Sequence, residues 1–217
     1  LSKKHILESV DGILKRLDME YLDALVLHRP DALVEPEEVA AAFDELEKSG
    51  KVRHFGVSNQ KPMQIELLKR YVKQPIEIDQ LQLSIPCSNM ITNGMEVNMA
   101  SEGAVDRDGS VLDYCRLNDI TIQAWSPFQY GFFEGVFIGN EEKYPKLNAV
   151  LNELADKYNV SPSGIATAWI LRHPAGIQMI AGSTSRKHMQ EIIDGSHVTL
   201  TKEEWYRLYL AGDHMLP

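Results

Sequence analysis

The chain has 217 residues, of which 22 are basic, 31 are acidic and 44% are hydrophobic, and its formal net charge is −9. This acidic balance argues against non-specific nucleic-acid binding and against an anionic membrane surface, because both need clustered positive charge. No apolar run approaches the roughly 20 residues that span a bilayer. The length and apolar content suit one large α/β domain over residues 1–217.

Two features of the sequence bear on the cellular location of the protein and on the extent of the chain. Cys87 and Cys115 have no C-x-x-C spacing, so we interpret them as free thiols of a cytoplasmic protein. The chain begins at Leu1 rather than Met and opens directly into a helical pattern, so we expect that an amino-terminal part is missing. The sequence does not define an oligomeric state.

The first half of the chain alternates helical and extended patterns. Apolar residues on one helical face predict a helix that begins after Ser2, and Pro36 and Gly50 bound a second helix. A third helix is predicted around Ile65–Leu68. The extended patterns predict strands, the first of them buried on both faces, at Leu22–Leu27, Val52–Val57 and Ile76–Ile85.

The second half continues this alternation after an irregular segment. Residues Pro86–Gly109 are rich in Asn, Met, Gly and Ser, and a loop this long is usually functional or mobile. A glycine-rich and aromatic connection covers Pro127–Asn140. Strands are predicted at Ile120–Trp125 and Ile177–Ala181. Helices are predicted at Val111–Leu117, from Leu147 to Tyr158, after Ser161-Pro162, through Met189 and Ile192, and after a capping box of Thr201 and Glu204.

Such alternation predicts a parallel sheet with helices outside. A closed barrel needs eight strands and about 250 residues. Five strands therefore leave three β/α units missing if the fold is a barrel, and an open sheet is the alternative. Against the open sheet, no G-x-G-x-x-G follows a strand, so the usual dinucleotide fingerprint of open sheets is absent.

His28 follows the first predicted strand and precedes Arg29-Pro30-Asp31. Ligands of parallel α/β folds bind at the carboxyl ends of the strands, which is where His28 is expected. A neutral imidazole there can donate a hydrogen bond to a carbonyl oxygen and polarise it. The alternative is an ordinary hydrogen-bonded histidine at a strand end.

Ser58 and Asn59 end the second strand, and Gln80 lies within the third. A nicotinamide carboxamide has one acceptor and two donor hydrogens, and Ser, Asn and Gln supply complementary groups. We therefore expect these three residues to hold a carboxamide. The alternative is a turn followed by a helix N-cap.

Two later strand ends also carry candidate ligand groups. Trp125 precedes Ser126-Pro127, and its indole is either core or a surface on which a flat ring stacks. Residues 182–186, Gly-Ser-Thr-Ser-Arg, lead into a helix whose free N–H groups favour a phosphate, although an ordinary capped helix has the same appearance. No histidine pair has metal-ligand spacing and no G-x-S-x-G occurs, so neither a metal site nor a serine hydrolase is predicted.

Five motifs taken in order resemble the aldo-keto reductase family, and the resemblance runs from Leu1 to about Glu204. They are LHRPD at 27–31, GVSN at 56–59, DQLQLS at 79–84, AWSP at 124–127 and IAGSTS at 180–185. The match is best to the oxidoreductase branch that includes bacterial members.

The resemblance implies a (β/α)8 TIM barrel of which this chain supplies strand 4 onward. It implies an enzyme that transfers a hydride from NADPH, or from NADH, to the carbonyl of a small aldehyde or ketone. The family tetrad is Asp, Tyr, Lys and His, and only the histidine maps onto this chain, at His28. Residues 1–217 alone are therefore expected not to reduce carbonyls. An NADP-binding regulatory or redox-sensing barrel without turnover is the first rival, and an unrelated TIM-barrel lyase or hydrolase is the second.

The resemblance also assigns cofactor contacts. It implies that Ser58, Asn59 and Gln80 hold the carboxamide and that Trp125 stacks on the nicotinamide. Gly182 stands where many members carry lysine, and His188 where arginine usually grips the 2′-phosphate, with Arg186 or Lys187 as substitutes. The cofactor is therefore expected to be NADP(H), with NAD(H) as the alternative. The remaining implied contacts, from the phosphate-side loop and the last strand end, are Ser126, Phe128, Tyr130, Ser183 and Thr184.

Overall fold

The computed structural model describes residues 1–132 and 134–216, which form two compact units. The first unit comprises Leu1–Gln80 and Asp113–Thr121, and the second comprises Leu81–Leu112 and Ile122–Pro217. The described residues contain five strands in the order β1-β2-β3-β4-β5, with parallel pairing of β1 with β2, β2 with β3, and β4 with β5. The predicted α/β class with a parallel sheet is therefore confirmed, whereas one domain over residues 1–217 stays a prediction.

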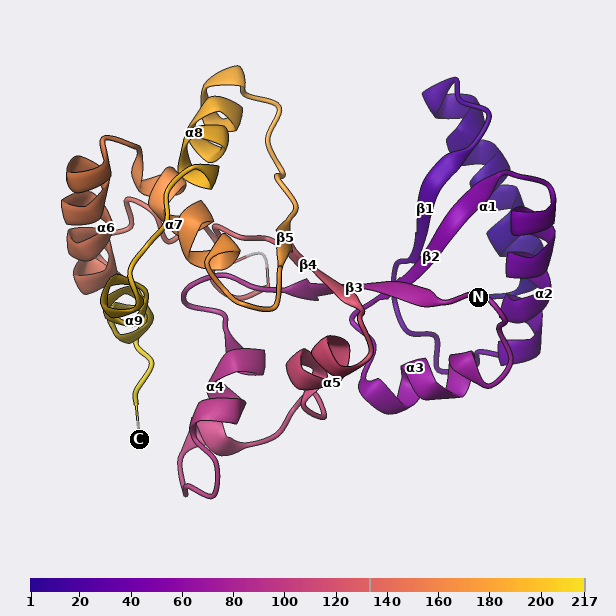
Figure 1. The fold of residues 1–217 in the computed structure, drawn as a ribbon, viewed down its shortest axis with the longest axis horizontal. Helices are drawn as coiled ribbons and strands as arrows, with labels where there is room; N and C mark the ends of the chain where they lie inside the picture. The colour runs from indigo at the N-terminus through magenta and orange to yellow at the C-terminus, as the bar shows by residue number, and fades with distance from the viewer. Residues whose placement is uncertain (133, 217) are drawn as a thin grey trace. The chain divides into compact units, whose positions relative to one another are not determined.

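In the first unit, two helices cover strands β1 and β2 on one side (Figure 1). The Ser2 hydroxyl accepts the His5 N–H at 3.4 Å and begins α1, and Pro36 occupies the first turn of α2. Phe43 and Phe55 stack with ring centroids 4.2 Å apart and join α2 to β2. The elements in this unit are α1 (Lys3–Leu17), β1 (Leu22–Leu27), α2 (Pro36–Lys48), β2 (Val52–Ser58), α3 (Pro62–Lys69) and most of β3 (Ile76–Gln82).

The expectation that β1 is buried on both faces is wrong. Asp23 and Ala24 are exposed, and Leu25 and Val26 are only half-buried. The reason is that β1 is first in the strand order, with β2 as its neighbour among the described strands. Its apolar sequence therefore indicates a strand suited to burial, but its position in the sheet leaves much of it uncovered.

In the second unit, helices α6 (Pro145–Tyr158) and α8 (Arg186–Ser196) pack on α7 (Pro162–Leu171) (Figure 1). Trp169 of α7 and Trp205 of α9 stack at 4.8 Å, and each indole N–H donates to the other residue's carbonyl oxygen, at 3.1 and 2.9 Å. The predicted Thr201–Glu204 capping box is present. The elements are α4 (Asn89–Met95), η1 (Glu102–Ala104), α5 (Val111–Leu117, shared between the units), β4 (Thr121–Trp125), α6 (Pro145–Tyr158), α7 (Pro162–Leu171), β5 (Gln178–Met179), α8 (Arg186–Ser196) and α9 (Lys202–Ala211).

Several predicted elements differ from the structure in extent or in kind. The segment Pro86–Gly109 is not irregular throughout, because burial of Met90 and Ile91 stabilises α4 despite its Asn and Gly. Strand β3 ends at Gln82 rather than Ile85, and β5 is only Gln178–Met179. No helix within the described residues is long and apolar enough to cross a bilayer.

Candidate cofactor and active site

Ser58, Asn59 and Gln80 lie together in the first unit. Ser58 pairs with Gln80 in the β2–β3 register, and its hydroxyl donates to the Gln80 carbonyl oxygen at 2.9 Å. The Asn59 side-chain N–H donates to the Ser58 Oγ at 2.8 Å, and the Asn59 backbone N–H donates to the Gln80 carbonyl at 3.0 Å. The structure therefore brings together the three residues that the sequence singles out for a carboxamide.

Gly56 sets the register of this cluster. A Cβ at Gly56 would lie 2.7 Å from the Ile78 Cβ and 2.8 Å from the Ile78 carbonyl oxygen, so only glycine permits this approach of β2 to β3. The β2–β3 register shifts between Phe55 and Gly56, and the strand then continues to Ser58 opposite Gln80. Asn59 leaves the strand with φ +54°, a left-handed conformation that Asn tolerates better than most residues.

His28 is exposed directly after β1. The register pairs Leu27 with Val57, so His28 and Ser58 come next on neighbouring parallel strands and at the same end of them. A cavity of about 530 Å³ next to α1 includes His28 in its lining. This position at the carboxyl end of a strand is the one expected for a catalytic histidine.

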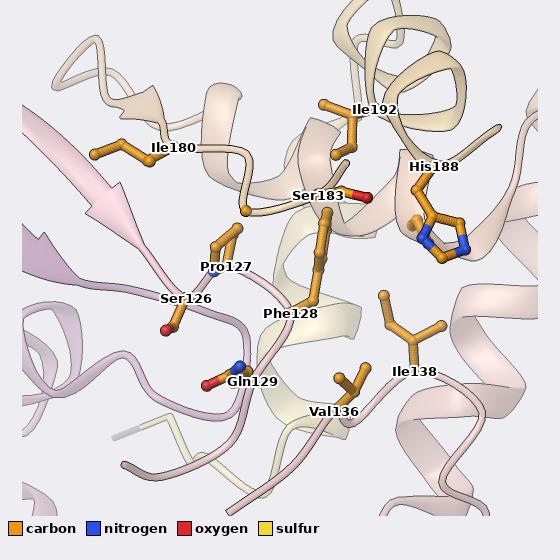
Figure 2. Close-up of a pocket in the computed structure, with 12 residues that line it drawn as sticks. Ser126, Pro127, Phe128, Gln129, Val136, Ile138, Ile180, Ser183, His188 and Ile192 are labelled. Carbon is orange, nitrogen blue, oxygen red and sulfur yellow. The ribbon is translucent and has the colours of Figure 1, made fainter. Parts of the chain in front are cut away.

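A second cavity, of about 470 Å³, lies entirely in the second unit (Figure 2). Figure 2 shows the loop after β4 on one side of it and the segment from Ile180 through the start of α8 on the other. Among the described residues none of its lining side chains is a carboxylate. The candidate cofactor residues in its lining are Ser126, Phe128, Gly182, Ser183 and His188.

The amino-terminal end of α8 borders this cavity. The Ser185 hydroxyl caps α8 by accepting the His188 backbone N–H at 3.5 Å, and the Ser183 hydroxyl accepts the Ser185 N–H at 3.1 Å. The first N–H groups of a helix have no intrahelical partner and carry its positive dipole end. Hydroxyls, helix N–H groups and the His188 imidazole together suit a phosphate.

The loop after β4 is held by polar residues at and beyond the end of β3, which the sequence analysis missed. The Ser84 hydroxyl donates to the Gln129 carbonyl at 2.6 Å, and the Gln82 side-chain amide donates to the Gly131 carbonyl at 2.8 Å. The Cys87 Sγ accepts the Gly131 N–H at 2.9 Å. A signal was present, because Gln80, Gln82 and Ser84 alternate with apolar residues and so share one face of the chain.

The structure places the other candidate cofactor residues outside the lining of this cavity. Trp125 contacts Phe132 edge-on at 6.3 Å, and Tyr130 packs on Tyr144 at 5.2 Å with the Lys143 ammonium 3.9 Å from its ring centre. Thr184 is exposed. Arg186 lines a separate shallow hollow on α8. Among the described residues, His188 is therefore the basic side chain in the lining of this cavity.

Asp79, beside Gln80, carries the most unusual carboxyl group of the first unit. It is 0% exposed, and neither carboxyl oxygen has a hydrogen-bond partner of normal geometry among the described residues. Burial raises its pKa from 3.8 to about 7, although the backbone N–H of Gln60 partly offsets that rise. Burial and the nearby Asp79 also raise the pKa of the Cys115 thiol to about 12.

Residues 1–210 match the model of the aldo/keto reductase family, and the chain therefore belongs to that family. It is 35% identical over 212 residues, 97% of its length, to the uncharacterised oxidoreductase YcsN of Bacillus subtilis. It is 30% identical over 206 residues, 94% of its length, to the 6-dehydroglucose reductase of Agrobacterium fabrum. A solved thermostable aldo-keto reductase in complex with the inhibitor epalrestat superposes on 97% of the chain with a TM-score of 0.75 at 26% identity.

The chain spans less than two thirds of the length of these two curated relatives, at 64% and 62%, and 67% of the solved structure. The family and the fold are thus defined for the residues present. The activity of a whole protein is a separate question.

Proposed function

We propose that the complete protein is a cytoplasmic nicotinamide-dependent oxidoreductase that transfers a hydride from NADPH to the carbonyl of a small aldehyde or ketone. NADH is the alternative coenzyme. The observation that carries the proposal is the cavity at the start of α8, with hydroxyl groups, a histidine and no carboxylate among the described residues that line it. Family membership supports the same reaction class.

The residues present fit such a coenzyme. A cavity of about 470 Å³ that lacks lining carboxylates suits an anionic, phosphate-bearing group at the α8 amino terminus. Ser58, Asn59 and Gln80 offer both donors and acceptors for a carboxamide. When bound, the nicotinamide supplies the hydride.

In this proposal the residues of this chain bind the coenzyme and orient the substrate. His28 donates a hydrogen bond to the substrate carbonyl oxygen and stabilises the negative charge that develops there. The cluster at Ser58 fixes the carboxamide. The family resemblance implies a tyrosine as the proton donor, and no residue of this chain matches that tyrosine. We therefore assign the proton donor to the part of the complete protein that corresponds to the relatives' remaining residues, which this chain does not cover.

Replacing Asn59 by Ala is expected to weaken NADPH binding. The change removes an amide that holds Ser58, and a lost hydrogen bond costs about 0.5–1.5 kcal/mol, or roughly two- to tenfold in Kd. Titration calorimetry of the complete protein measures the effect. Asn152→Ala, on the exposed face of α6, is the matched control and should leave Kd unchanged. Equal affinities for all three proteins would remove Asn59 from the binding site.

His28→Ala is expected to lower kcat about 10²-fold and to change coenzyme affinity little. A donor directed at a developing oxyanion acts mainly in the transition state, where its loss reduces turnover. The measurement is NADPH oxidation with a panel of aldehydes and ketones. His54→Ala is the control, because His54 is exposed on β2 and paired with Glu77 at 3.0 Å. Normal turnover of the His28 variant would exclude the proposed role of His28. If the wild-type protein itself binds NADPH tightly but reduces no carbonyl, a regulatory protein is favoured instead.

A further inference from the structure

A cavity of about 440 Å³ in the second unit shares no lining residue with the cavity at the start of α8. Its apolar side is formed by Ile91 and Met95 of α4, and its aromatic side by Trp205 and Tyr206 of α9. Arg172, at the carboxyl end of α7, and Lys202, in the first turn of α9, also line it. It is therefore a separate place where a ligand would be held.

The aromatic side of this cavity is preformed. Trp205 is fixed against Trp169 by stacking at 4.8 Å and by reciprocal indole-to-carbonyl hydrogen bonds. Tyr206 meets Trp205 edge-on at 5.1 Å, and Tyr209 continues the stack on Trp205 at 5.7 Å. Because these rings are already held in place, a ligand that packs on them loses little free energy to reorganisation.

The charge of the cavity is opposite to that of the chain. Among the described residues its lining contains two permanent cations and no carboxylate, although the whole chain has a net charge of −9. Within the described part of the chain, neither Arg172 nor Lys202 forms an ion pair. The Arg172 Nε donates to the Leu200 carbonyl at 2.8 Å, which fixes the guanidinium.

The acidic groups near this cavity are already engaged. Glu204 binds the Lys157 ammonium at 2.5 Å and accepts the Tyr158 hydroxyl at 2.7 Å. Glu96, on the α4 side, accepts a hydrogen bond from the Ser101 hydroxyl. Glu203 follows Lys202, and the pKa of its carboxyl is lowered chiefly by hydrogen bonds at its own helix end and only then by the Lys202 charge. The lining therefore retains positive charge for a ligand.

We propose that this cavity binds a small aromatic carboxylate. The ring would pack between the aromatic side at Trp205 and Tyr206 and the apolar side at Met95. The carboxylate would accept charge-assisted hydrogen bonds from Arg172 and Lys202. This site is independent of the coenzyme cavity and of the reaction proposed for it.

The test uses phenylacetate as the probe and the complete protein labelled with ¹⁵N-tryptophan, with and without NADPH. Phenylacetate is expected to shift the Trp205 indole N–H signal and to bind with a Kd of about 1 mM. Phenylacetamide, which has the same shape without the charge, should bind about tenfold more weakly. Lys202→Gln should raise the Kd for phenylacetate about fivefold, and Lys146→Gln, an exposed lysine of α6, should leave it unchanged.

Each contrary result overturns the proposal. Equal binding of phenylacetate and phenylacetamide would show that the cations play no part. A shift at Trp125 without one at Trp205 would place the probe elsewhere in the second unit. An unshifted Trp205 signal would show that the cavity is closed in the complete protein, for instance by a segment of its own chain. Because Trp205 is read with and without NADPH, failure of coenzyme binding leaves this test intact.

Discussion

Gly195→Ala is expected to destabilise the protein by about 3 kcal/mol or more and to weaken coenzyme binding as well. Gly195 lies on α8 against Gly164 of α7, and a Cβ there would come within 2.3 Å of the Gly164 carbonyl oxygen and 2.4 Å of its Cα. These are backbone atoms, so the clash is relieved only when the two helices separate.

Separation of α8 from α7 has a functional consequence. The amino-terminal turn of α8 carries His188, and Ser163 at the start of α7 lines the same cavity. A displaced α8 therefore moves the proposed phosphate site away from the loop after β4. In catalytic and binding sites a displacement of about 1 Å is enough to lose much of the effect of a positioned group.

The measurements are denaturant unfolding and NADPH titration on the same variant. Gly94→Ala is the matched control, because Gly94 is also in a helix and a Cβ there would meet no atom within 4 Å. That variant should be neutral or up to about 1 kcal/mol more stable, since alanine is the better helix former. Equal unfolding midpoints for the Gly195 variant and the wild type would contradict the close packing of α7 on α8.

The helices that the sequence predicts well are those whose signals are local. Ser2, Pro36 and the Thr201–Glu204 pair define helix starts because a cap needs only residues within one turn. The Gly164–Gly195 contact could not be predicted in this way, because these glycines are distant in sequence and look like ordinary weak points of their helices. The same applies to β1, whose apolar run does not reveal a position at the end of the strand order.

The residues of the candidate site also differ in whether local sequence patterns predict them. Ser58, Asn59 and Gln80 were found from residue chemistry and motif resemblance, and the structure brings them together. Gln82, Ser84 and Cys87 were missed because their role depends on the path of the loop after β4, which no local pattern describes. Strand β3 thus contributes to the binding regions through its polar alternation, with Gln82 acting beside Gln80.

Asp79→Asn is expected to remove a large pH dependence of stability. The folded-state pKa of Asp79 is raised to about 7 from 3.8, chiefly by burial. Between about pH 4 and pH 7 the folded protein therefore keeps a proton that the unfolded chain has lost. Because the folded state binds more protons in this window, its contribution to stability falls as the pH rises through it. The loss is complete above pH 7 and amounts to about 4 kcal/mol.

The physical basis is the unpartnered carboxyl. Its neighbours on α5 are Tyr114 and the buried thiol of Cys115, so no cation compensates the charged form among the described residues. Asn is neutral at every pH and nearly isosteric. The variant should therefore match the wild type only below about pH 4, where Asp79 is protonated in both the folded and the unfolded states, and should exceed it increasingly as the pH rises to 8.

The experiment compares urea unfolding of the wild type, Asp79→Asn and Asp113→Asn at pH 5 and pH 8. Asp113 is an exposed carboxylate with Arg116 as its partner at 3.7 Å, and its variant reports the background from ordinary surface titration. The difference between Asp79→Asn and the wild type should grow by about 3 kcal/mol from pH 5 to pH 8, because about two pH units below the folded-state pKa are crossed, while that of the control stays nearly constant. A difference that does not change with pH would mean that Asp79 is ionised or solvated in the folded protein. In that case the carboxyl would have a partner that its buried position on β3 does not reveal.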